Sequence, residues 1–423
     1  MHPTAPIRTT LTTDVVIIGA GPGGCAAAIA ARRGGLDVVV VDRAQFPRDK
    51  ICGDGLTASA LRELEALGLD PRMVPSWISV DDVTVRSPGG REVVLPLPDD
   101  GATFAAVARR TDLDAALVAL AERSGARVLQ GHALSSIDVS DHEVIAHVDV
   151  ADGPSTRIVA RHAIAADGMW SPTRKAMGLE EPGYRGEWHA FRQYVRGVSD
   201  RAARELVVWF EPDLLPGYAW SFPLGDGSAN LGFGILRGGD GYRVPDMAQV
   251  WRELLTRPHV RGFLGPDATL EGPPRAWPIP ARVGRTRLTS HRVLFVGDAA
   301  RAADPMTGEG IGQALQTGRW AAEAVVAHDR QPLLVARAYE LAVRDELAID
   351  HRFAERQGSV LRHPLGARLA LGIVGATGWT RRNFGRWLFE GYPRALVLTP
   401  SRWAPGALTA PGAYGDADAH PSD

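Results

Sequence analysis

The feature that most constrains the fold is a glycine-rich turn between two apolar segments near the N-terminus. Residues 14–18 (DVVII) form a short apolar run typical of a buried parallel strand, and residues 19–24 (GAGPGG) follow at once. A helix rich in alanine is predicted over 25–33, and a second apolar strand over 36–41 ends at Asp42. This order of strand, turn, helix and strand predicts a parallel βαβ unit that binds a dinucleotide.

Each residue of this turn has an expected task. Gly19 permits the tight turn, Gly21 lets the backbone approach a pyrophosphate, and Gly24 lets the helix and strand pack closely. The N-terminus of the helix then faces the phosphates with its partial positive charge. Asp42, 18 residues after Gly24, is placed to accept hydrogen bonds from ribose hydroxyls. The predicted contacts of this unit also include Pro22, Gly23 and Arg43.

A second glycine-rich segment near residue 300 favours FAD over NAD. An apolar strand over 293–296 leads into Asp298 within 297–300 (GDAA), then into 304–312 (DPMTGEGIG) and a helix over 313–327. The carboxylate of Asp298 can bind a ribityl chain, or it can cap a helix. The loop can offer N–H groups to the pyrimidine edge of a flavin, where negative charge gathers on reduction. For this contact we predict Gly310 and Ile311.

Composition excludes several classes of protein. The 423 residues carry 47 Lys and Arg against 49 Asp and Glu, whereas nucleic-acid-binding proteins usually show a basic excess. Two cysteines, Cys25 and Cys52, allow no disulfide framework, and the histidines lack metal-ligand spacing. The N-terminus lacks the apolar region of a signal peptide, and no stretch reaches the ~18 apolar residues of a membrane span. We therefore predict a cytoplasmic protein, soluble or peripheral at the inner face of the membrane, with no metal and no nucleic-acid partner.

Several further motifs carry a resemblance to a known family. Residues 46–55 (FPRDKICGDG) are similar to a Pro-x-x-x-x-Cys-Gly segment, and residues 110–114 (RTDLD) match an Arg-x-x-Leu-Asp segment. Asp167 and Gly168 resemble the Asp-Gly motif of flavoproteins. Residues 218–223 (YAWSFP) with 232–234 (GFG) resemble a Tyr-x-Trp-x-Phe-Pro…Gly-x-Gly signature. With these motifs the chain resembles flavoproteins of the p-hydroxybenzoate hydroxylase fold and, within that fold, the geranylgeranyl reductase family.

The resemblance implies a fold of the α/β (α+β) class. It has a Rossmann-type FAD-binding domain of the p-hydroxybenzoate hydroxylase kind, an antiparallel-sheet substrate domain and a helical C-terminus. Within the first domain, a helix is predicted over 112–124 and strands over 127–130, 143–150, 156–159 and 163–166. The predicted boundaries are 14–75, 100–185 and 286–335 for the FAD-binding domain, 76–99 and 186–285 for the substrate sheet, 336–404 for the helical region, and 405–423 for a disordered tail.

The resemblance also implies a site beside the flavin. It places Cys52 there with three possible roles. The thiol could donate a proton, the side chain could shape the pocket, or the residue could touch the flavin only through its backbone. Tyr218, Trp220 and Phe222 alternate along a predicted strand, so their side chains point to one face, either into the core or as an apolar wall over the flavin. The catalytic set is thus Cys52, Tyr218, Trp220 and Phe222, and further FAD contacts are expected at Cys52, Gly53, Arg110 and Ala133.

The implied reaction is the reduction of carbon–carbon double bonds in a prenyl chain. A hydride would pass from flavin N5 to one alkene carbon and a proton to the other. The substrate would be an apolar small molecule or prenyl lipid, such as a geranylgeranyl lipid, a prenylated quinone or a terpenoid. The electron donor is NADPH or ferredoxin, and nothing in the sequence sets the oligomeric state.

Three other functions fit the fold. A monooxygenase would use a flavin hydroperoxide and depend on oxygen. A halogenase would carry Trp-x-Trp-x-Ile-Pro and a catalytic lysine, whereas this chain has no lysine between Lys50 and Lys175. A non-catalytic prenyl-lipid carrier would have lost its flavin ligands, and here the set is complete.

The C-terminal region suggests a contact with membranes. Residues 369–379 are apolar but too short to span a bilayer, and Arg381, Arg382 and Arg386 follow, interleaved with aromatic residues. Basic and aromatic residues together are typical of an interfacial helix. Residues 365–390 are therefore expected either to contact a membrane surface or to pack against the flavin domain.

Overall fold

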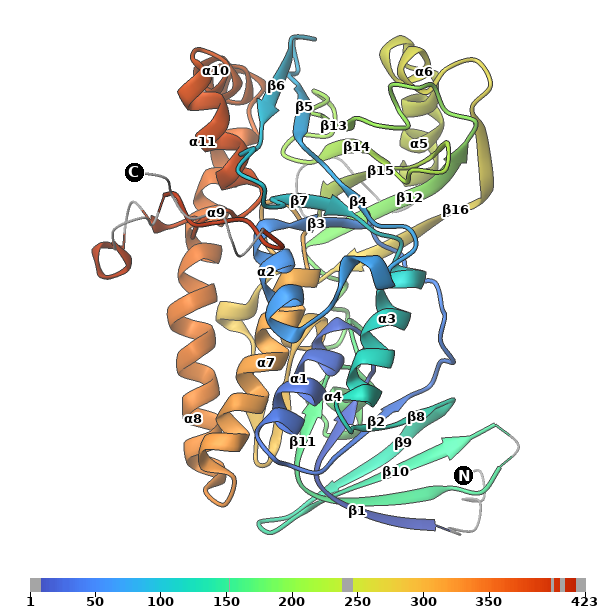
Figure 1. The fold of residues 1–423 in the computed structure, drawn as a ribbon, viewed down its shortest axis with the longest axis vertical. Helices are drawn as coiled ribbons and strands as arrows, with labels where there is room; N and C mark the ends of the chain where they lie inside the picture. Colours follow the sequence, from blue (N-terminus) through green and yellow to red (C-terminus); the bar gives the residue numbers. More distant parts are fainter. Residues whose placement is uncertain (1–8, 152, 238–245, 397–398, 404–407, 416–423) are drawn as a thin grey trace.

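The computed structural model describes residues 9–151, 153–237, 246–396, 399–403 and 408–415. Two large sheets stand at opposite ends of the molecule, and helices fill the space between them and cover one side (Figure 1). The eight-stranded sheet has the order β17-β18-β11-β1-β2-β8, with β10 and β9 added antiparallel beyond β11. Five of its strands, β18, β11, β1, β2 and β8, run parallel.

The centre of this sheet is fully covered, which explains its continuous apolar sequence. Residues 15–18 of β1 and 38–41 of β2 are buried, with no polar side to face water. Helix α1 packs against α3 and α7, and α7 also packs against α2 and α8. Glycines make the α1–α7 contact close, because a Cβ at Gly318 would lie 2.1 Å from the carbonyl oxygen of Gly23. The strands are β1 (Thr9–Ile18), β2 (Val38–Asp42), β8 (Arg127–Gln130), β9 (His132–Val139), β10 (Val144–Val150), β11 (Thr156–Ala165), β17 (Thr289–Ser290) and β18 (Val293–Phe295).

The seven-stranded sheet forms the other end, with the order β16-β12-β15-β14-β13-β5-β6. It is antiparallel as predicted except at the β13–β5 pair, which is parallel. Helices α5 and α6 cover one face, where Trp251, Leu254 and Phe263 join its apolar core. The strands are β5 (Asp82–Arg86), β6 (Glu92–Pro96), β12 (Trp188–Arg196), β13 (Leu206–Trp209), β14 (Tyr218–Pro223), β15 (Ser228–Leu236) and β16 (Thr269–Ile279).

A small sheet of β3 (Gly55–Thr57), β7 (Ala105–Val107) and β4 (Ile78–Ser79) lies between the two large ones. Residues 78–79 therefore pair with this sheet, while 82–96 join the seven-stranded one. The described helices are α1 (Pro22–Arg33), α2 (Ala58–Leu67), α3 (Arg110–Arg123), α4 (Pro172–Ala176), α5 (Met247–Thr256), α6 (Pro258–Leu264), α7 (Ile311–His328), α8 (Pro332–Ala342), α9 (Ile349–Leu361), α10 (Pro364–Val374) and α11 (Gly378–Leu388). None of the helices in this part of the chain is long and apolar enough to cross a membrane.

Two sequence predictions differ from the structure. The predicted strands over 156–159 and 163–166 are one strand, β11, because the polar residues between them are satisfied: Arg161 pairs with Asp14 and Asp329. Disorder does not extend through 408–415, since Ala413 forms a β-bridge with Thr103. The other residues of the predicted tail, 405–407 and 416–423, lie outside the described part.

Candidate functional site

The turn after β1 accepts only glycine at two positions. Gly19 has φ of +103°, and a Cβ there would lie 2.4 Å from the carbonyl oxygen of Ala166. A Cβ at Gly24 would lie 1.8 Å from the carbonyl oxygen of Gly19, so the first helical turn runs directly against the strand end. Gly21 is the N-cap of α1, and no side-chain hydrogen bond caps this end. The geometry matches the predicted phosphate turn, with backbone N–H groups at the helix N-terminus.

Asp42 lies at the carboxyl end of β2 and braces this turn. Its Oδ2 accepts a hydrogen bond from the N–H of Ala20 at 2.8 Å, and its Oδ1 accepts one from the N–H of Ala44 at 2.8 Å. The carboxylate is therefore beside the glycine turn, where the sequence places it. Arg43 is exposed next to it. Ribose binding by Asp42 and a cofactor contact at Arg43 remain predictions.

Positive charge gathers near the same turn. Arg110 begins α3 and is buried, with its Nε and Nη2 each 2.8 Å from an oxygen of Asp114. Arg48 binds the same carboxylate, Nη1 to Oδ2 at 2.8 Å. The Arg48 guanidinium also lies 3.8 Å from the position that a Cβ of Gly21 would take. Two arginines sharing one carboxylate leave a net positive charge close to the phosphate end of α1.

Asp298 follows β18, as predicted, with a half-buried carboxylate. The short 3₁₀ helix 297–300 has Val296 as its N-cap, so the alternative in which Asp298 caps a helix is wrong. Within the described residues, only the backbone carbonyl of Asp298 accepts a hydrogen bond, from Arg301. Its Oδ1 lies 3.8 Å from the position that a Cβ of Gly310 would take, so the carboxylate lies beside the glycine-rich loop and has acceptor capacity to spare.

The N-terminus of α7 is capped differently from the sequence expectation. Gly310 is its N-cap, but Glu309 Oε1 accepts hydrogen bonds from the N–H of Ile311 at 2.8 Å and of Gly312 at 3.0 Å. Burial, with the neighbouring charge of Glu390, raises the pKa of Glu309 to about 8. A flavin edge at Gly310 and Ile311 would have to share or replace this carboxyl group, so those two contacts stay predictions.

A hydrogen-bond network from the substrate sheet holds the loop that carries Cys52. Asn230 on β15 donates through Nδ2 to the carbonyl oxygen of Cys52 at 2.9 Å and to Oδ2 of Asp54 at 2.8 Å. Trp220 Nε1 donates to Asn230 Oδ1 at 3.1 Å, and Tyr194 Oη donates to Asp54 Oδ2 at 2.9 Å. Asp54 has φ of +66° and is fully buried, so these bonds hold a left-handed backbone in place.

The protonation states of this loop follow from its burial. Burial raises the pKa of the Asp54 carboxyl to about 6, although Asn230, Arg192 and Tyr194 oppose the shift. Burial likewise raises the pKa of the Cys52 thiol, and the Arg110 guanidinium beside it offsets part of that effect. Cys52 is therefore a protonated thiol at neutral pH, held in a loop with little freedom to move.

Tyr218, Trp220 and Phe222 share one face of β14, as their spacing predicts. Neighbouring ring centroids are 5.9 Å and 6.1 Å apart along the strand. This aromatic face packs on the Cys52 loop: a Cβ at Gly53 would lie 3.6 Å from both Trp220 and Phe222, and a Cβ at Gly55 3.0 Å from Phe222. Trp220 is only 5% exposed, so Tyr218 and Phe222 offer the more accessible surface. Their role as a prenyl wall remains a prediction.

Lys50 lies in the same loop, and its side chain is partly buried. Its ammonium lies 3.6 Å from the ring centroid of Trp277, a cation–π contact. Burial lowers the pKa of Lys50 to about 8, against the attraction of the Asp298 carboxylate. A partly desolvated cation thus lies within electrostatic reach of Asp298.

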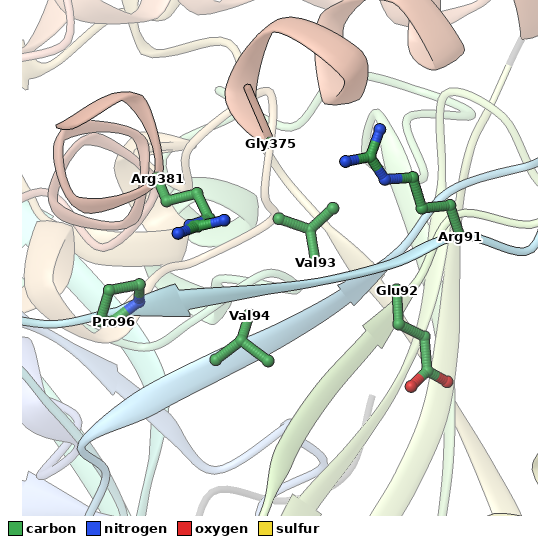
Figure 2. A pocket seen from close by; sticks show the side chains of 7 residues that line it. All are labelled: Arg91, Glu92, Val93, Val94, Pro96, Gly375 and Arg381. Carbon is green, nitrogen blue, oxygen red and sulfur yellow. The ribbon is translucent and has the colours of Figure 1, made fainter. Parts of the chain in front are cut away.

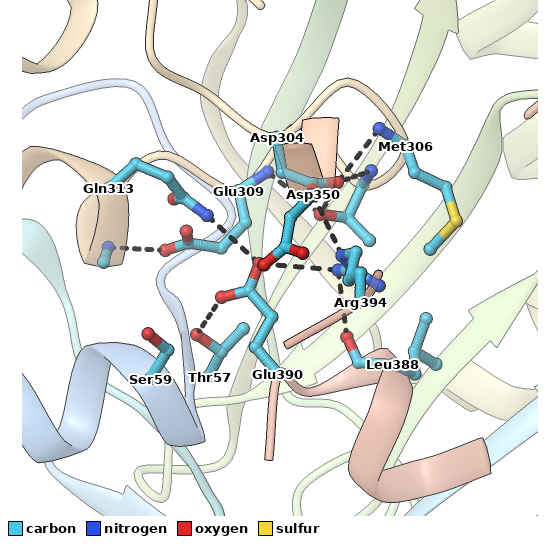
Figure 3. A network of polar contacts seen from close by, with 12 residues as sticks. Thr57, Ser59, Asp304, Met306, Glu309, Gln313, Asp350, Leu388, Glu390 and Arg394 are labelled. Atoms are coloured by element: carbon cyan, nitrogen blue, oxygen red, sulfur yellow. Dashed lines mark hydrogen bonds and ion pairs between the residues drawn. The ribbon is translucent and has the colours of Figure 1, made fainter. Parts of the chain in front are cut away.

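A buried polar network joins the segment after α11 to the glycine-rich loop over 304–312 (Figure 3). Arg394 Nε lies 3.0 Å from Asp304 Oδ2, and both side chains are 2% exposed. Glu390 accepts hydrogen bonds from Gln313 Nε2 and Thr57 Oγ1, each at 3.0 Å. The segment after α11 therefore binds both the start of the glycine-rich loop, through Asp304, and the first turn of α7, through Gln313.

Sequence reasoning missed Asn230, Tyr194 and Arg394. Only Asn230 carried a local signal, as a polar residue within the apolar strand 228–236. Ala133 lies on β9 opposite Asp149, close after the strand β8 that pairs with β2, and its cofactor contact remains a prediction.

The residues present fit FAD. The glycine turn that a Cβ would fill, the Asp42 carboxylate beside it and the available Asp298 carboxylate are the donor and acceptor set that a dinucleotide with a ribityl chain requires. Residues 12–211 also match a family model described as an FAD binding domain.

Two groups of reductases are similar to this chain in sequence. A menaquinone reductase of Mycobacterium tuberculosis is 34% identical over 370 residues, which cover 84% of this chain and 85% of that protein. A digeranylgeranylglycerophospholipid reductase of Methanothrix thermoacetophila is 31% identical over 319 residues, covering 74% of this chain and 77% of that protein.

Solved structures share the fold. A geranylgeranyl bacteriochlorophyll reductase-like protein from Thermoplasma acidophilum superposes with a TM-score of 0.77 at 22% identity, over 92% of this chain and 98% of that one. A flavin-dependent brominase superposes with a TM-score of 0.68 at 21% identity, over 85% of this chain and 90% of that one. The fold is that of p-hydroxybenzoate hydroxylase-type flavoproteins, and the chain belongs to the geranylgeranyl reductase family of FAD-dependent oxidoreductases.

Proposed function

We propose that this enzyme reduces carbon–carbon double bonds in the prenyl chain of a lipid, quinone or terpenoid. The observation that carries the proposal is the aromatic face of β14 packed over the loop of Cys52. An apolar face suits a chain without hydrogen-bonding groups, and a protonated thiol lies in the loop beneath it. The names of the similar reductases support the same class of substrate.

The chain's own residues hold the proton and exclude water. FAD, when bound, supplies a hydride from N5 to one alkene carbon. Cys52 holds the proton for the other carbon, and Arg110 beside it stabilises the thiolate left behind. An isolated alkene has no carbonyl to activate it, so orientation and exclusion of water must lower much of the barrier. The bonds from Asn230 and Trp220 serve that orientation by holding the loop still.

A prenyl lipid or prenylated quinone resides in a bilayer, so we place a peripheral membrane contact at 365–390. Some residues of the predicted interfacial set pack inward instead. Arg386 Nη2 donates to the carbonyl oxygen of Ala410, and Phe384 is partly buried against the apolar core of β5 and β6. We therefore assign the membrane contact to the outer side of α10 and the start of α11.

Anaerobic mixing tests the proposed reaction. Dithionite-reduced holoprotein is mixed with menaquinone, geranylgeranyl lipids and short prenyl alcohols, and the flavin spectrum and product mass are followed. We expect flavin reoxidation with a mass gain of two hydrogens per double bond for at least one long prenyl substrate. Reoxidation that requires oxygen and adds an oxygen atom would instead establish a monooxygenase.

Cys52→Ser should slow the reoxidation of reduced flavin by substrate by roughly 10²–10⁴-fold, the usual contribution of a positioned proton donor. A hydroxyl is a far weaker acid than a thiol, so the second carbon receives its proton slowly. Flavin content should stay normal. Cys25→Ser is the matched control: Cys25 is buried in α1, and among the described residues its thiol donates only to the carbonyl oxygen of Ala20 just before the helix, a bond that serine can keep. An unchanged half-reaction in Cys52→Ser would leave Cys52 a packing residue.

A further inference from the structure

Helix α10 is apolar on two sides, and only one of them is covered. Ala367, Leu371 and Val374 are buried, and the last two join the apolar core of β5 and β6. Leu365, Leu369 and Ile373, four residues apart on another side, are 61%, 68% and 68% exposed. A helix of a soluble protein normally exposes a polar face at this position. The outer stripe of α10 is therefore an unpartnered apolar surface.

Arginines flank this stripe in the sequence, and the same segment contains no acid. Residues 361–389 contain five arginines and no Asp or Glu. Arg368 and Arg382 are exposed, and Trp379, at the start of α11, is 65% exposed. Apolar, aromatic and basic side chains on one surface are typical of a protein face that rests in the interface of an anionic membrane.

A pocket of about 380 Å³ opens beside this surface, between β6 and the α10–α11 turn at Gly375. Arg91 and Arg381 line it together with Val93, all on the helix side of the strand, whereas Glu92 and Val94 point to the opposite side (Figure 2). Glu92 is engaged there by Arg201 at 3.2 Å. The helix side of the pocket thus combines two guanidinium groups with an apolar wall, a chemistry that suits a lipid phosphate.

We propose that α10, the start of α11 and this pocket form a docking surface for bilayers that carry anionic phospholipids, with one lipid phosphate between Arg91 and Arg381. The inference rests on the proposed function in one respect: a prenyl substrate resides in a bilayer, so an enzyme that reduces it has to reach the membrane surface. A second copy of the chain is a poorer occupant, because a two-fold contact through this face would bring like-charged arginines together.

The surface joins the candidate site through one sheet. The strand order β6-β5-β13-β14 runs from the pocket to the strand that carries Tyr218, Trp220 and Phe222. In Figure 1, α10 and α11 stand beside β6 at the same end of the molecule as this sheet. A docked protein would hold its substrate sheet near the bilayer from which the substrate comes.

The test is co-sedimentation of holoprotein with vesicles of phosphatidylcholine, with and without one-third phosphatidylglycerol. We expect the partition coefficient to be at least tenfold higher for the anionic vesicles. Arg91→Ala/Arg381→Ala should lose about fivefold per arginine on anionic vesicles, the factor that corresponds to ~1 kcal/mol per cation near such a surface. Leu369→Ser/Ile373→Ser should bind both vesicle types at least tenfold more weakly.

Matched controls remove the same groups elsewhere. Leu333→Ser replaces an 84% exposed leucine at the start of α8, and Arg72→Ala/Arg285→Ala removes two exposed arginines outside the surface. Both controls should bind like the natural chain. Equal loss in the controls, equal binding to neutral and anionic vesicles, or a dimer that Leu369→Ser/Ile373→Ser dissociates would overturn the proposal. Prenyl reduction assayed in detergent separates the two ideas, since docking without reduction refutes only the proposed reaction.

Discussion

Replacing Arg394 by methionine is expected to lower the free energy of unfolding by about 3–5 kcal/mol, the usual cost of removing one partner from a buried ion pair. The guanidinium is 2% exposed and lies 3.0 Å from Asp304, with Glu390 at 3.5 Å. Methionine fills much of the volume but leaves the Asp304 carboxylate buried without its counter-charge. Urea unfolding of the holoprotein at neutral pH, followed by tryptophan fluorescence, measures the loss.

Two further variants isolate the cause. Arg394→Met/Asp304→Asn should be more stable than Arg394→Met alone, because the uncompensated charge is gone. Arg344→Ala, which breaks an exposed pair with Asp345, should show no measurable change. A double variant no more stable than the single one would show that Arg394 acts through packing.

The pH dependence gives an independent check. Although burial opposes it, Arg394 and then His351 hold the pKa of Asp304 below its usual value, so this contribution to stability is lost as the pH falls through that pKa. Without Arg394, burial should raise the pKa of Asp304. The deficit of Arg394→Met should therefore be greatest near neutrality. It should shrink as the pH falls below the raised pKa of the folded variant towards ~4, the ordinary pKa of an aspartate in an unfolded chain, because the buried carboxyl is then protonated and needs no counter-charge.

The sequence predicted those parts of the site that depend on neighbours along the chain. The turn at Gly19 and Gly24 and the common face of Tyr218 and Trp220 follow from local spacing and strand period, and the structure has both. Asp298 likewise follows its strand directly. These features need no knowledge of which distant segment packs against them.

The missed residues act over long separations in the chain. Asn230 binds Asp54 across 176 residues, and Arg394 binds Asp304 across 90. No periodicity in either segment identifies its partner, because a buried polar side chain is satisfied by whatever the tertiary fold brings to it. Glu309 shows a second limit. The glycine-rich motif predicts a helix N-terminus whose N–H groups are free to bind a ligand. In the structure, the Glu309 side chain within that motif accepts the hydrogen bonds of two of them, from Ile311 and Gly312.

Replacing Asp298 by alanine is expected to weaken FAD binding by ~1.5–3 kcal/mol, roughly ten- to more than a hundredfold in Kd. We assign this carboxylate to the ribityl chain, and hydrogen bonds to a charged acceptor are worth about that much. The structure makes the test selective. Since no described residue donates a hydrogen bond to the side chain, the variant loses no internal hydrogen bond, only the attraction of Asp298 for Lys50. The apoprotein should therefore unfold at nearly the same urea concentration as the natural chain.

The contrast between cofactor-free and cofactor-bound protein decides the assignment. Flavin fluorescence released on dilution of the holoprotein gives Kd, and the rise in Tm with added FAD should shrink in Asp298→Ala, as ligand-linked stability requires. Asp298→Asn should fall between the two, because it keeps one acceptor oxygen and loses the charge. Asp99→Ala, at an exposed aspartate, should leave both values unchanged. If Asp298→Ala instead lowered apoprotein stability with normal FAD affinity, Asp298 would be a structural residue of the Gly297 turn, and the ribityl contact would have to come from elsewhere.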